Sequence, residues 1–228
     1  MIRIAEIFHS LQGEGMLVGV PSVFIRTSGC NLRCVWCDTP YASWEPEGEA
    51  LAVEEIAERA GSYGASHVVV TGGEPMMFPE IVSLTANLRR FFAHITIETA
   101  GTVHQPVTCD LMSISPKLSN STPWGREEGR WAAQHERLRI QADVLRRLMK
   151  DFEYQLKFVV QSTDDMQEIL DILDQTGASR ERVLLMPEAT DRESLHERSL
   201  WLAELCRQYH FRFSPRLHIE LWGGKRGV

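Results

Sequence analysis

The sequence predicts an α/β protein whose mostly parallel sheet forms an incomplete (β/α) barrel. Runs of β-branched residues alternate along the chain with stretches in which apolar residues recur at helical spacing. Repeated strand–helix units of this kind build parallel sheets with right-handed crossovers. The 228 residues fall short of the roughly 250 that a complete eight-stranded barrel needs. About seven strands in a single domain over residues 1–228 are therefore expected.

The predicted strands are short apolar runs that end in polar residues or glycines, at 22–28, 67–73, 94–101, 111–117, 154–162, 182–188 and 211–221. The predicted helices share apolar residues three and four positions apart, at 53–63, 79–92, 138–149, 164–177 and 194–210. Gly177 is a plausible C-cap of the fourth helix. Residues 119–134 show no clear period and are expected to form a mobile or functional loop, or a plain surface connection.

Composition excludes several classes of function. The net charge of −7, from 24 basic and 31 acidic residues, argues against a nucleic-acid or membrane-surface binder. No apolar run reaches the roughly 18 residues of a membrane span, and the N-terminus lacks the pattern of a signal peptide. The five cysteines are odd in number and three are clustered, unlike a disulfide framework. A reducing, cytoplasmic location is therefore expected.

Residues 28–41, "SGCNLRCVWCDTPY", contain Cys30, Cys34 and Cys37. Thiolates suit iron–sulfur clusters, zinc and copper(I). Structural zinc usually takes four protein ligands, whereas the remaining two cysteines lie far away in the sequence. Three thiolates without a fourth suit a [4Fe–4S] cluster with one iron left for an exogenous ligand. A zinc site and a redox switch remain as alternatives.

Four unusual stretches follow predicted strands. They are the cysteine loop, "TGGEP" at 71–75, "SPK" at 115–117 and "MPE" at 186–188. The chemistry of parallel α/β folds lies at the carboxyl ends of the strands. The four stretches should therefore share one edge of the sheet and form a single active site.

The spacing C-x₃-C-x₂-C, with Trp36 before the last cysteine, resembles the radical S-adenosylmethionine (SAM) superfamily. In that superfamily three cysteines hold a [4Fe–4S] cluster whose fourth iron binds SAM, and the reduced cluster cleaves SAM to a 5′-deoxyadenosyl radical. "TGGEP" resembles the glycine-rich element that binds the amino group of SAM. Gly72 and Gly73 allow a close approach of backbone carbonyls, and Glu74 is an acceptor for an ammonium group.

Further motifs resemble the 7-carboxy-7-deazaguanine synthase family. They are "FHSLQGEG" (8–15), "WCDT" (36–39), "ETAGT" (98–102), "KFVVQ" (157–161) and "LHIELWGGKRGV" (217–228), and the resemblance spans most of the chain. It implies conversion of 6-carboxy-5,6,7,8-tetrahydropterin to 7-carboxy-7-deazaguanine with loss of ammonia, assisted by Mg²⁺, in queuosine biosynthesis. It also implies a homodimer and an electron donor such as flavodoxin or ferredoxin.

The same resemblance implies roles for individual residues. Substrate contacts are implied for Leu11, Gln12, Gly13, Glu14, Arg26, Thr71 and His218, and Glu14, Arg26 and Thr71 are expected to be catalytic. An arginine fork suits the substrate carboxylate, and Glu14 suits the guanidine-like edge of the pterin. Cofactor contacts are implied for Trp36, Cys37, Asp38, Gly72, Gly73, Glu74, Glu98, Ser115, Pro116, Lys117, Lys157 and Gln161. Thr39 is implied as a Mg²⁺ ligand, with substrate oxygens and water completing the octahedron.

Two alternatives differ in class from this interpretation. A glycyl-radical-enzyme activase would share the cysteine spacing but would need a groove for a protein loop. A non-catalytic zinc-binding protein would share the thiols but would be colourless, whereas an iron–sulfur protein is brown.

Overall fold

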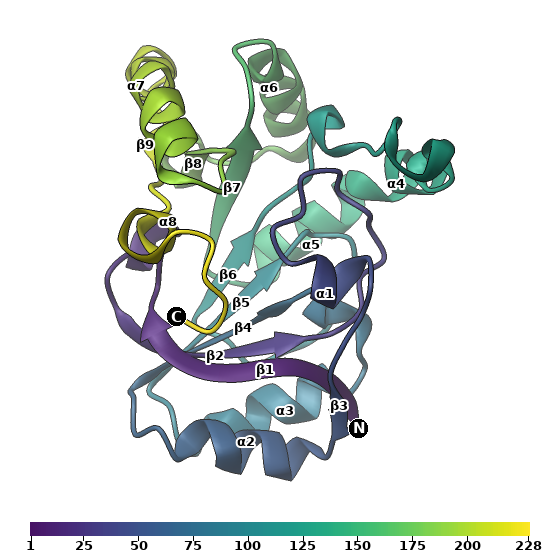
Figure 1. Cartoon of the computed structure of the whole chain (residues 1–228), viewed down its shortest axis with the longest axis vertical. Coiled ribbons are helices and arrows are strands. Elements are labelled where there is room, and N and C mark those ends of the chain that lie inside the picture. The colour runs from purple at the N-terminus through teal and green to yellow at the C-terminus, as the bar shows by residue number, and fades with distance from the viewer.

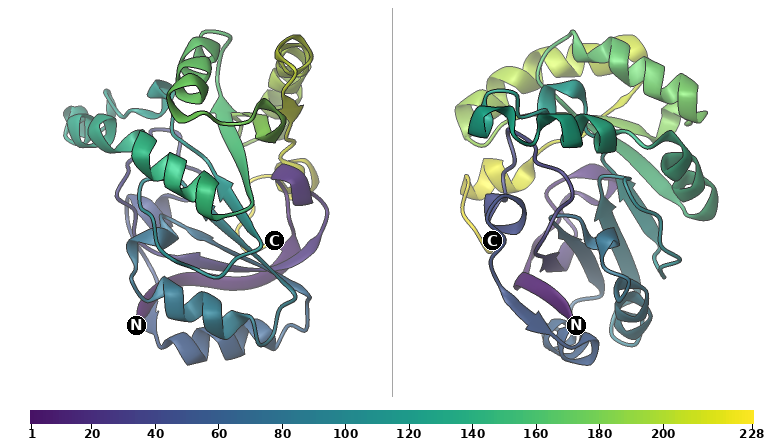
Figure 2. Two further views of the ribbon diagram at one scale, coloured as in Figure 1. Left: turned by 180° about the vertical axis from the view of Figure 1, so that it is seen from behind. Right: turned by 90° about the vertical axis from the view of Figure 1, so that its right-hand side faces the viewer.

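The apolar runs of the sequence form one nine-stranded sheet in the computed structural model, which describes residues 1–228. Its strand order is β3-β1-β2-β4-β5-β6-β7-β8-β9. From β2 onward neighbouring strands are parallel, whereas β1 pairs antiparallel with both β2 and β3. The sheet curves but does not close, and its outer face is covered by helices (Figures 1 and 2). The predicted incomplete (β/α) barrel is therefore confirmed.

The strands are β1 Ile2–Leu11, β2 Pro21–Thr27, β3 Glu49–Leu51, β4 His67–Gly72, β5 His94–Thr99, β6 Leu111–Ile114, β7 Tyr154–Val160, β8 Val183–Pro187 and β9 Arg212–Phe213. The α-helices are α1 Pro40–Ser43, α2 Val53–Gly61, α3 Ile81–Leu88, α4 Ala132–Arg139, α5 Ala142–Asp151, α6 Asp165–Thr176, α7 Arg192–Tyr209 and α8 Leu217–Trp222. Short 3₁₀ turns occupy Gly15–Leu17, Pro75–Met77, Ser119–Ser121, Arg126–Gly129 and Arg180–Arg182.

The two faces of the sheet have different environments because side chains alternate along each strand. In β2, Val23 and Ile25 are fully buried in the core between the sheet and the helices. Their neighbours Phe24 and Arg26 point to the inner face, where they line a cavity. The register pairs Arg26 with Thr71 of β4, so both side chains reach the same side. Alternation along the strands thus separates the apolar core from the polar interior of the barrel.

Several predicted boundaries differ from the structure. The strands β1 and β3 were not expected. The predicted strand 211–221 is wrong beyond Phe213, because Pro215 has no N–H for a ladder and the chain continues as α8. The predicted helix 138–149 is broken at residues 140–141 into α4 and α5.

Two other local predictions have clear outcomes. Segment 119–134, expected as a loop, instead contains two 3₁₀ turns and the beginning of α4. Gly177 caps α6 as predicted, with a left-handed φ of 69° and its N–H donating to the carbonyl of Leu173 at 2.8 Å. None of the helices combines the length and the apolar character needed to cross a membrane.

Candidate active site

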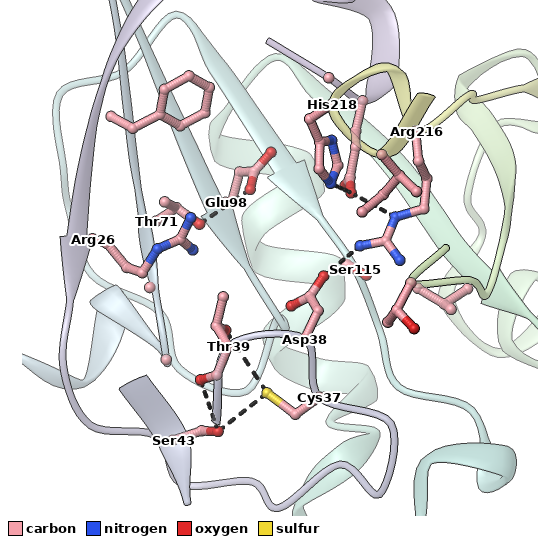
Figure 3. Close-up of a pocket in the computed structure, with 18 of the residues that line it drawn as sticks. Arg26, Cys37, Asp38, Thr39, Ser43, Thr71, Glu98, Ser115, Arg216 and His218 are labelled. Carbon is pink, nitrogen blue, oxygen red and sulfur yellow. Dashed lines mark hydrogen bonds and ion pairs between the residues drawn. The ribbon is translucent and has the colours of Figure 1, made fainter. Parts of the chain in front are cut away.

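A cavity of about 390 Å³ opens on the inner face of the sheet at the carboxyl ends of the parallel strands. This volume lies in the range of small-molecule sites. The predicted residues that line it are Leu11, Gln12, Gly13, Glu14, Arg26, Cys30, Cys34, Trp36, Cys37, Asp38, Thr39, Thr71, Gly72, Gly73, Glu98, Ser115, Lys117, Lys157 and His218. Figure 3 shows side chains from both ends of the chain facing one another across this cavity. One cavity therefore collects the motifs that the sequence placed on one sheet edge.

The three clustered cysteines lie on the wall formed by residues 28–41 and are not joined in disulfides. Cys34 packs with Leu32 and Ala100 and is only 8% exposed. Burial, together with nearby Glu74, raises the pKa of Cys30 to about 12, and burial likewise raises that of Cys34. Without a bound cation these two thiols remain protonated, so binding a positively charged group here must displace their protons.

The glycine-rich turn after β4 packs directly against the cysteine loop. A Cβ at Gly73 would lie 2.1 Å from the carbonyl oxygen of Gly29 and 2.5 Å from that of Ala42, so only glycine fits at this position. The N–H of Glu74 donates to the carbonyl of Gly29 at 2.9 Å. This contact fixes the turn relative to the thiols.

Glu74, which is expected to contact the cofactor, makes its hydrogen bonds within the protein. Its side chain is fully buried and does not line the cavity. The carboxylate accepts hydrogen bonds from Thr99 Oγ1 at 2.8 Å and from the N–H groups of Ala100 and Met76 at 2.7 and 3.0 Å. It therefore joins the ends of β4 and β5 instead of presenting an acceptor to a ligand. Burial raises the pKa of this carboxyl group despite these bonds.

Two further predicted cofactor contacts also lie outside the cavity lining. Pro116 is buried, and only its neighbours Ser115 and Lys117 reach the cavity. Gln161 follows β7 and donates its N–H to Asp165 at 2.7 Å, at the start of α6. The alternation that turns Lys157 and Val159 towards the cavity ends with β7 at Val160, so Gln161 does not continue it.

Arg26 presents a partly free guanidinium group to the cavity. Its Nε donates to Glu6 Oε1 at 2.7 Å, while its two terminal nitrogens have no partner within the chain. Glu6 also accepts a hydrogen bond from Tyr41 at 2.8 Å and holds this arginine in place. Burial opposes the charge of Arg26, but Tyr41 and Glu6 outweigh it and the pKa is raised. A fixed cation with two unused donors suits a carboxylate.

Thr71 and Glu98 are adjacent on the floor of the cavity (Figure 3). Thr71 Oγ1 donates to Glu98 Oε2 at 3.1 Å, and Gln12 Nε2 donates to Glu98 Oε1 at 3.4 Å. Lys157 Nζ lies 3.7 Å from the same Oε1. The predicted substrate and cofactor residues of this group are thus joined in one polar network.

Glu14 is the centre of a buried ion-pair network. It pairs with Lys157 and with Arg216, whose Nε lies 3.2 Å from Glu14 Oε1. His218 Nε2 is 3.9 Å from the same oxygen. Burial raises the pKa of Glu14, but Lys157, Arg216 and His218 outweigh it and hold the pKa well below its usual range. Glu14 is therefore a carboxylate at neutral pH.

Arg216 completes this network, although no sequence motif pointed to it. It is 5% exposed, precedes α8, and pairs with both Glu14 and Asp38. Its Nη1 also donates to the carbonyl of Ala189. Burial opposes the ionisation of Asp38, but Arg216 outweighs it and the pKa of Asp38 is lowered. Arg216 thus ties the cysteine loop and residue 14 to the C-terminal helix.

His218 lies in α8, not in the strand expected at that position. Its ring packs so closely on Gly13 that a Cβ there would lie 2.2 Å from Nδ1. The N–H of Leu217 donates to the carbonyl of Gly13 at 2.9 Å. Burial keeps the pKa of His218 below its ordinary value even though Glu14 is near. The "LQGEG" stretch and α8 therefore form one wall of the cavity.

Ser43, which the sequence analysis also missed, contacts both Cys37 and Thr39. Its Oγ lies 3.1 Å from Cys37 Sγ and donates to the carbonyl of Thr39 at 3.3 Å. Thr39 Oγ1 faces the cavity 3.8 Å from the same sulfur (Figure 3). The predicted Mg²⁺ ligand and the last cysteine are thus neighbours.

The C-terminal tail, residues 223–228, also lines the cavity. Arg226 donates to Glu6 at 3.1 Å and to Glu47 at 3.0 Å, and its guanidinium group lies 3.8 Å from the ring centre of Tyr41. Glu6 therefore connects the tail to Arg26.

The donor set fits an iron–sulfur cluster. No group of three or more His, Cys, Asp or Glu side chains is spaced to hold one metal ion. In a [4Fe–4S] cluster each thiolate binds a different iron, so the three sulfurs need only surround a common core. The three thiols line one cavity without a fourth cysteine, and Gly73 packs directly against the backbone of the loop that carries them.

An incomplete barrel with three thiols and a glycine-rich turn around one cavity defines a radical SAM enzyme. Residues 24–115 match the Radical SAM superfamily. The 7-carboxy-7-deazaguanine synthase of Halobacterium salinarum is 45% identical, covering 97% of this chain and 90% of that protein. The enzyme of the same name from Rhodopirellula baltica is 44% identical, covering 100% of this chain and 89% of that protein.

A solved structure gives the same result. The crystal structure of QueE from Escherichia coli superimposes with a TM-score of 0.70 at 26% identity, covering 95% of this chain and 94% of that one. The chain therefore belongs to the 7-carboxy-7-deazaguanine synthase family of radical SAM enzymes. Membership decides against the glycyl-radical activase and the zinc-binding protein. It also implies a [4Fe–4S] cluster and SAM as cofactors.

Proposed function

We propose that this chain converts 6-carboxy-5,6,7,8-tetrahydropterin to 7-carboxy-7-deazaguanine with loss of ammonia, in queuosine biosynthesis. The observation that carries the proposal is the single cavity in which the cysteine thiols face Arg26, Glu14 and Thr71. The cluster and SAM supply the radical chemistry when they are bound. The protein's own contribution is to bind, orient and shield the substrate.

The charges in the cavity suit the two ends of this substrate. Arg26 offers its two free nitrogens to the carboxylate, while Glu6 fixes their direction. Glu14, ionised and held by Lys157 and Arg216, accepts hydrogen bonds from the amino-pyrimidinone edge. Thr71, Gln12 and Glu98 form the polar floor between them. The opposed cation and anion therefore select one orientation of the pterin.

Mg²⁺, with Thr39 as its protein ligand, is part of the proposal. The Thr39 hydroxyl lines the cavity and is not consumed by a strong internal hydrogen bond. One hydroxyl satisfies a single position of the octahedron that Mg²⁺ requires, so the substrate carboxylate and water must fill the rest. Thr39 would thus hold the metal on the wall of the cavity that carries the cysteine loop.

The partners of the reaction are also proposals. A one-electron donor of the flavodoxin or ferredoxin type reduces the cluster, and the active form is a homodimer. A reducing cytoplasm suits the protein because all five of its cysteines are free thiols.

The test is anaerobic incubation of reconstituted protein with SAM, dithionite, Mg²⁺ and the carboxypterin, followed by mass detection of the deazapurine. We expect 7-carboxy-7-deazaguanine and 5′-deoxyadenosine to appear together. Omitting Mg²⁺ should slow product formation more than it slows SAM cleavage. Formation of 5′-deoxyadenosine without any deazapurine would show that the substrate assignment is wrong.

Replacement of Arg26 by alanine should weaken substrate binding while uncoupled SAM cleavage survives. Loss of a charge-assisted pair of hydrogen bonds corresponds to about a 10- to 100-fold rise in Kd or KM for the carboxypterin. Arg26→Lys keeps the charge but not the fork and should lie in between. Arg3→Ala, on the exposed side of β1, serves as the matched control. Unchanged affinity in Arg26→Ala would refute the carboxylate contact.

A further inference from the structure

The cysteine loop has almost no regular secondary structure between Gly29 and Thr39, so its backbone donors need partners from elsewhere in the chain. Two of those partners come from the segment between β6 and α5. The N–H of Val35 donates to the carbonyl of Ser121 at 2.8 Å. The N–H of Arg33 donates to Nδ1 of His135, in α4, at 3.1 Å. These two bonds hold the residues on either side of Cys34.

The hydrogen bonds determine the tautomer of His135. A backbone N–H can only donate, so Nδ1 carries no proton and Nε2 does. Nε2 then donates to Ser121 Oγ at 2.8 Å, and Ser121 Oγ donates to the carbonyl of Leu118. His135 is 1% exposed, and burial lowers its pKa to about 4. The ring is therefore neutral. Each donor in this series of hydrogen bonds, from the Arg33 amide through His135 to Ser121, has an acceptor.

Other contacts converge on the same stretch of the loop. Trp36 Nε1 donates to Asn120 Oδ1 at 3.1 Å, and Trp44 Nε1 donates to the carbonyl of Cys34 at 3.0 Å. Among these partners His135 is the only ionisable side chain, and it lies between the loop predicted at 119–134 and the helix predicted at 138–149. It does not line the cavity itself.

We propose that His135 is a positioning residue that pre-organises Cys34 for the iron–sulfur cluster by holding the Arg33 amide. It acts through the loop backbone and not through the metal or the substrate. Groups that orient a metal ligand from behind govern how tightly the metal is held. The inference rests on the cluster that superfamily membership implies and does not depend on which substrate is turned over.

Three substitutions separate this role from a packing role. His135→Asn places its Oδ1 where Nδ1 lies and keeps the acceptor for Arg33. His135→Gln places its amide near Nε2, so it keeps the bond to Ser121 but not the acceptor. His135→Leu removes both bonds. His67→Leu, at the opposite ends of the strands, controls for loss of a histidine.

The measurements are amide exchange at Arg33 in the full-length chain and the rate of iron loss from the reconstituted protein to a chelator. In His135→Leu and His135→Gln we expect both rates to rise about ten-fold, because both variants lack the buried acceptor for the Arg33 N–H. In His135→Asn and His67→Leu both rates should stay near the wild-type values. If His135→Leu does not fold, the comparison of His135→Asn with His135→Gln is sufficient to test the positioning role. Equal rates in the Asn and Gln variants, or no change in any variant, would overturn the proposal.

Discussion

Replacing Cys34 by alanine is expected to abolish both cluster binding and turnover while the fold remains. The thiolate is one of three ligands to an added cofactor, and the cavity holds no other cysteine that can replace it. Within the apoprotein Cys34 is a small buried side chain packed with Leu32 and Ala100. Its truncation should therefore lower the free energy of unfolding by only about 1 kcal/mol.

Iron content, absorption near 400 nm and 5′-deoxyadenosine formation test this expectation after anaerobic reconstitution. We expect iron to fall below the wild-type stoichiometry and SAM cleavage to be undetectable. Cys206→Ala is the matched control, because Cys206 is also buried, at 5% exposure, but lies on α7 outside the cavity. It should retain both the cluster and the activity. SAM cleavage at the wild-type rate in Cys34→Ala would contradict the ligand assignment.

The sequence predicts the parallel part of the fold well because apolar periodicity is a local signal. The common direction of the parallel strands places Arg26, Thr71 and Glu98 at one edge of the sheet, because each lies next to the carboxyl end of its strand. The antiparallel strand β1 was missed because its residues 6–11 mix polar and apolar side chains over a half-exposed face. Pro215 lacks the N–H that a strand ladder needs, which explains why β9 ends at Phe213 and the predicted closing strand does not form.

The site was predicted less completely because its electrostatics depend on contacts across the whole chain. Glu74 follows two glycines next to the cysteine loop, yet its carboxylate turns inward to bond the end of β5. Arg216 is separated from Glu14 by 202 positions and from Asp38 by 178, so no local pattern connects them. His135 likewise acts 102 positions away from Arg33. Pairings of this kind become visible only when the barrel has formed.

Replacing Arg216 by methionine is expected to cause the largest loss of stability among single substitutions in the cavity. The variant leaves Glu14 with Lys157 as its main partner, and Asp38 with none in direct contact. Removing one member of a buried ion-pair network costs about 3–5 kcal/mol, because a desolvated charge remains. We expect the lower end of this range, since 45% of the Asp38 side chain is exposed to the cavity. Urea denaturation of the apoprotein at pH 7 measures the loss.

The pH dependence of this loss identifies its electrostatic origin. In the wild type the pKa values of Glu14 and Asp38 are lowered, so their stabilising contribution is complete above their ordinary pKa values and disappears as the pH falls below them. In Arg216→Met these carboxyl groups protonate more readily, which relieves the buried charge as the pH falls. The gap in unfolding free energy between wild type and variant should therefore be widest at pH 7 and narrow towards pH 4.

A double-mutant cycle separates the loss of charge pairing from a loss of packing. Asp38→Asn removes the carboxylate that Arg216→Met leaves uncompensated, so the double variant should be more stable than Arg216→Met alone. Arg182→Met, which breaks an exposed pair with Glu153, should be nearly neutral at every pH. The loss of unfolding free energy in Arg216→Met could instead be independent of pH and not relieved by Asp38→Asn. That result would show that Arg216 stabilises the protein by packing and that its charge does not stabilise the network around Glu14.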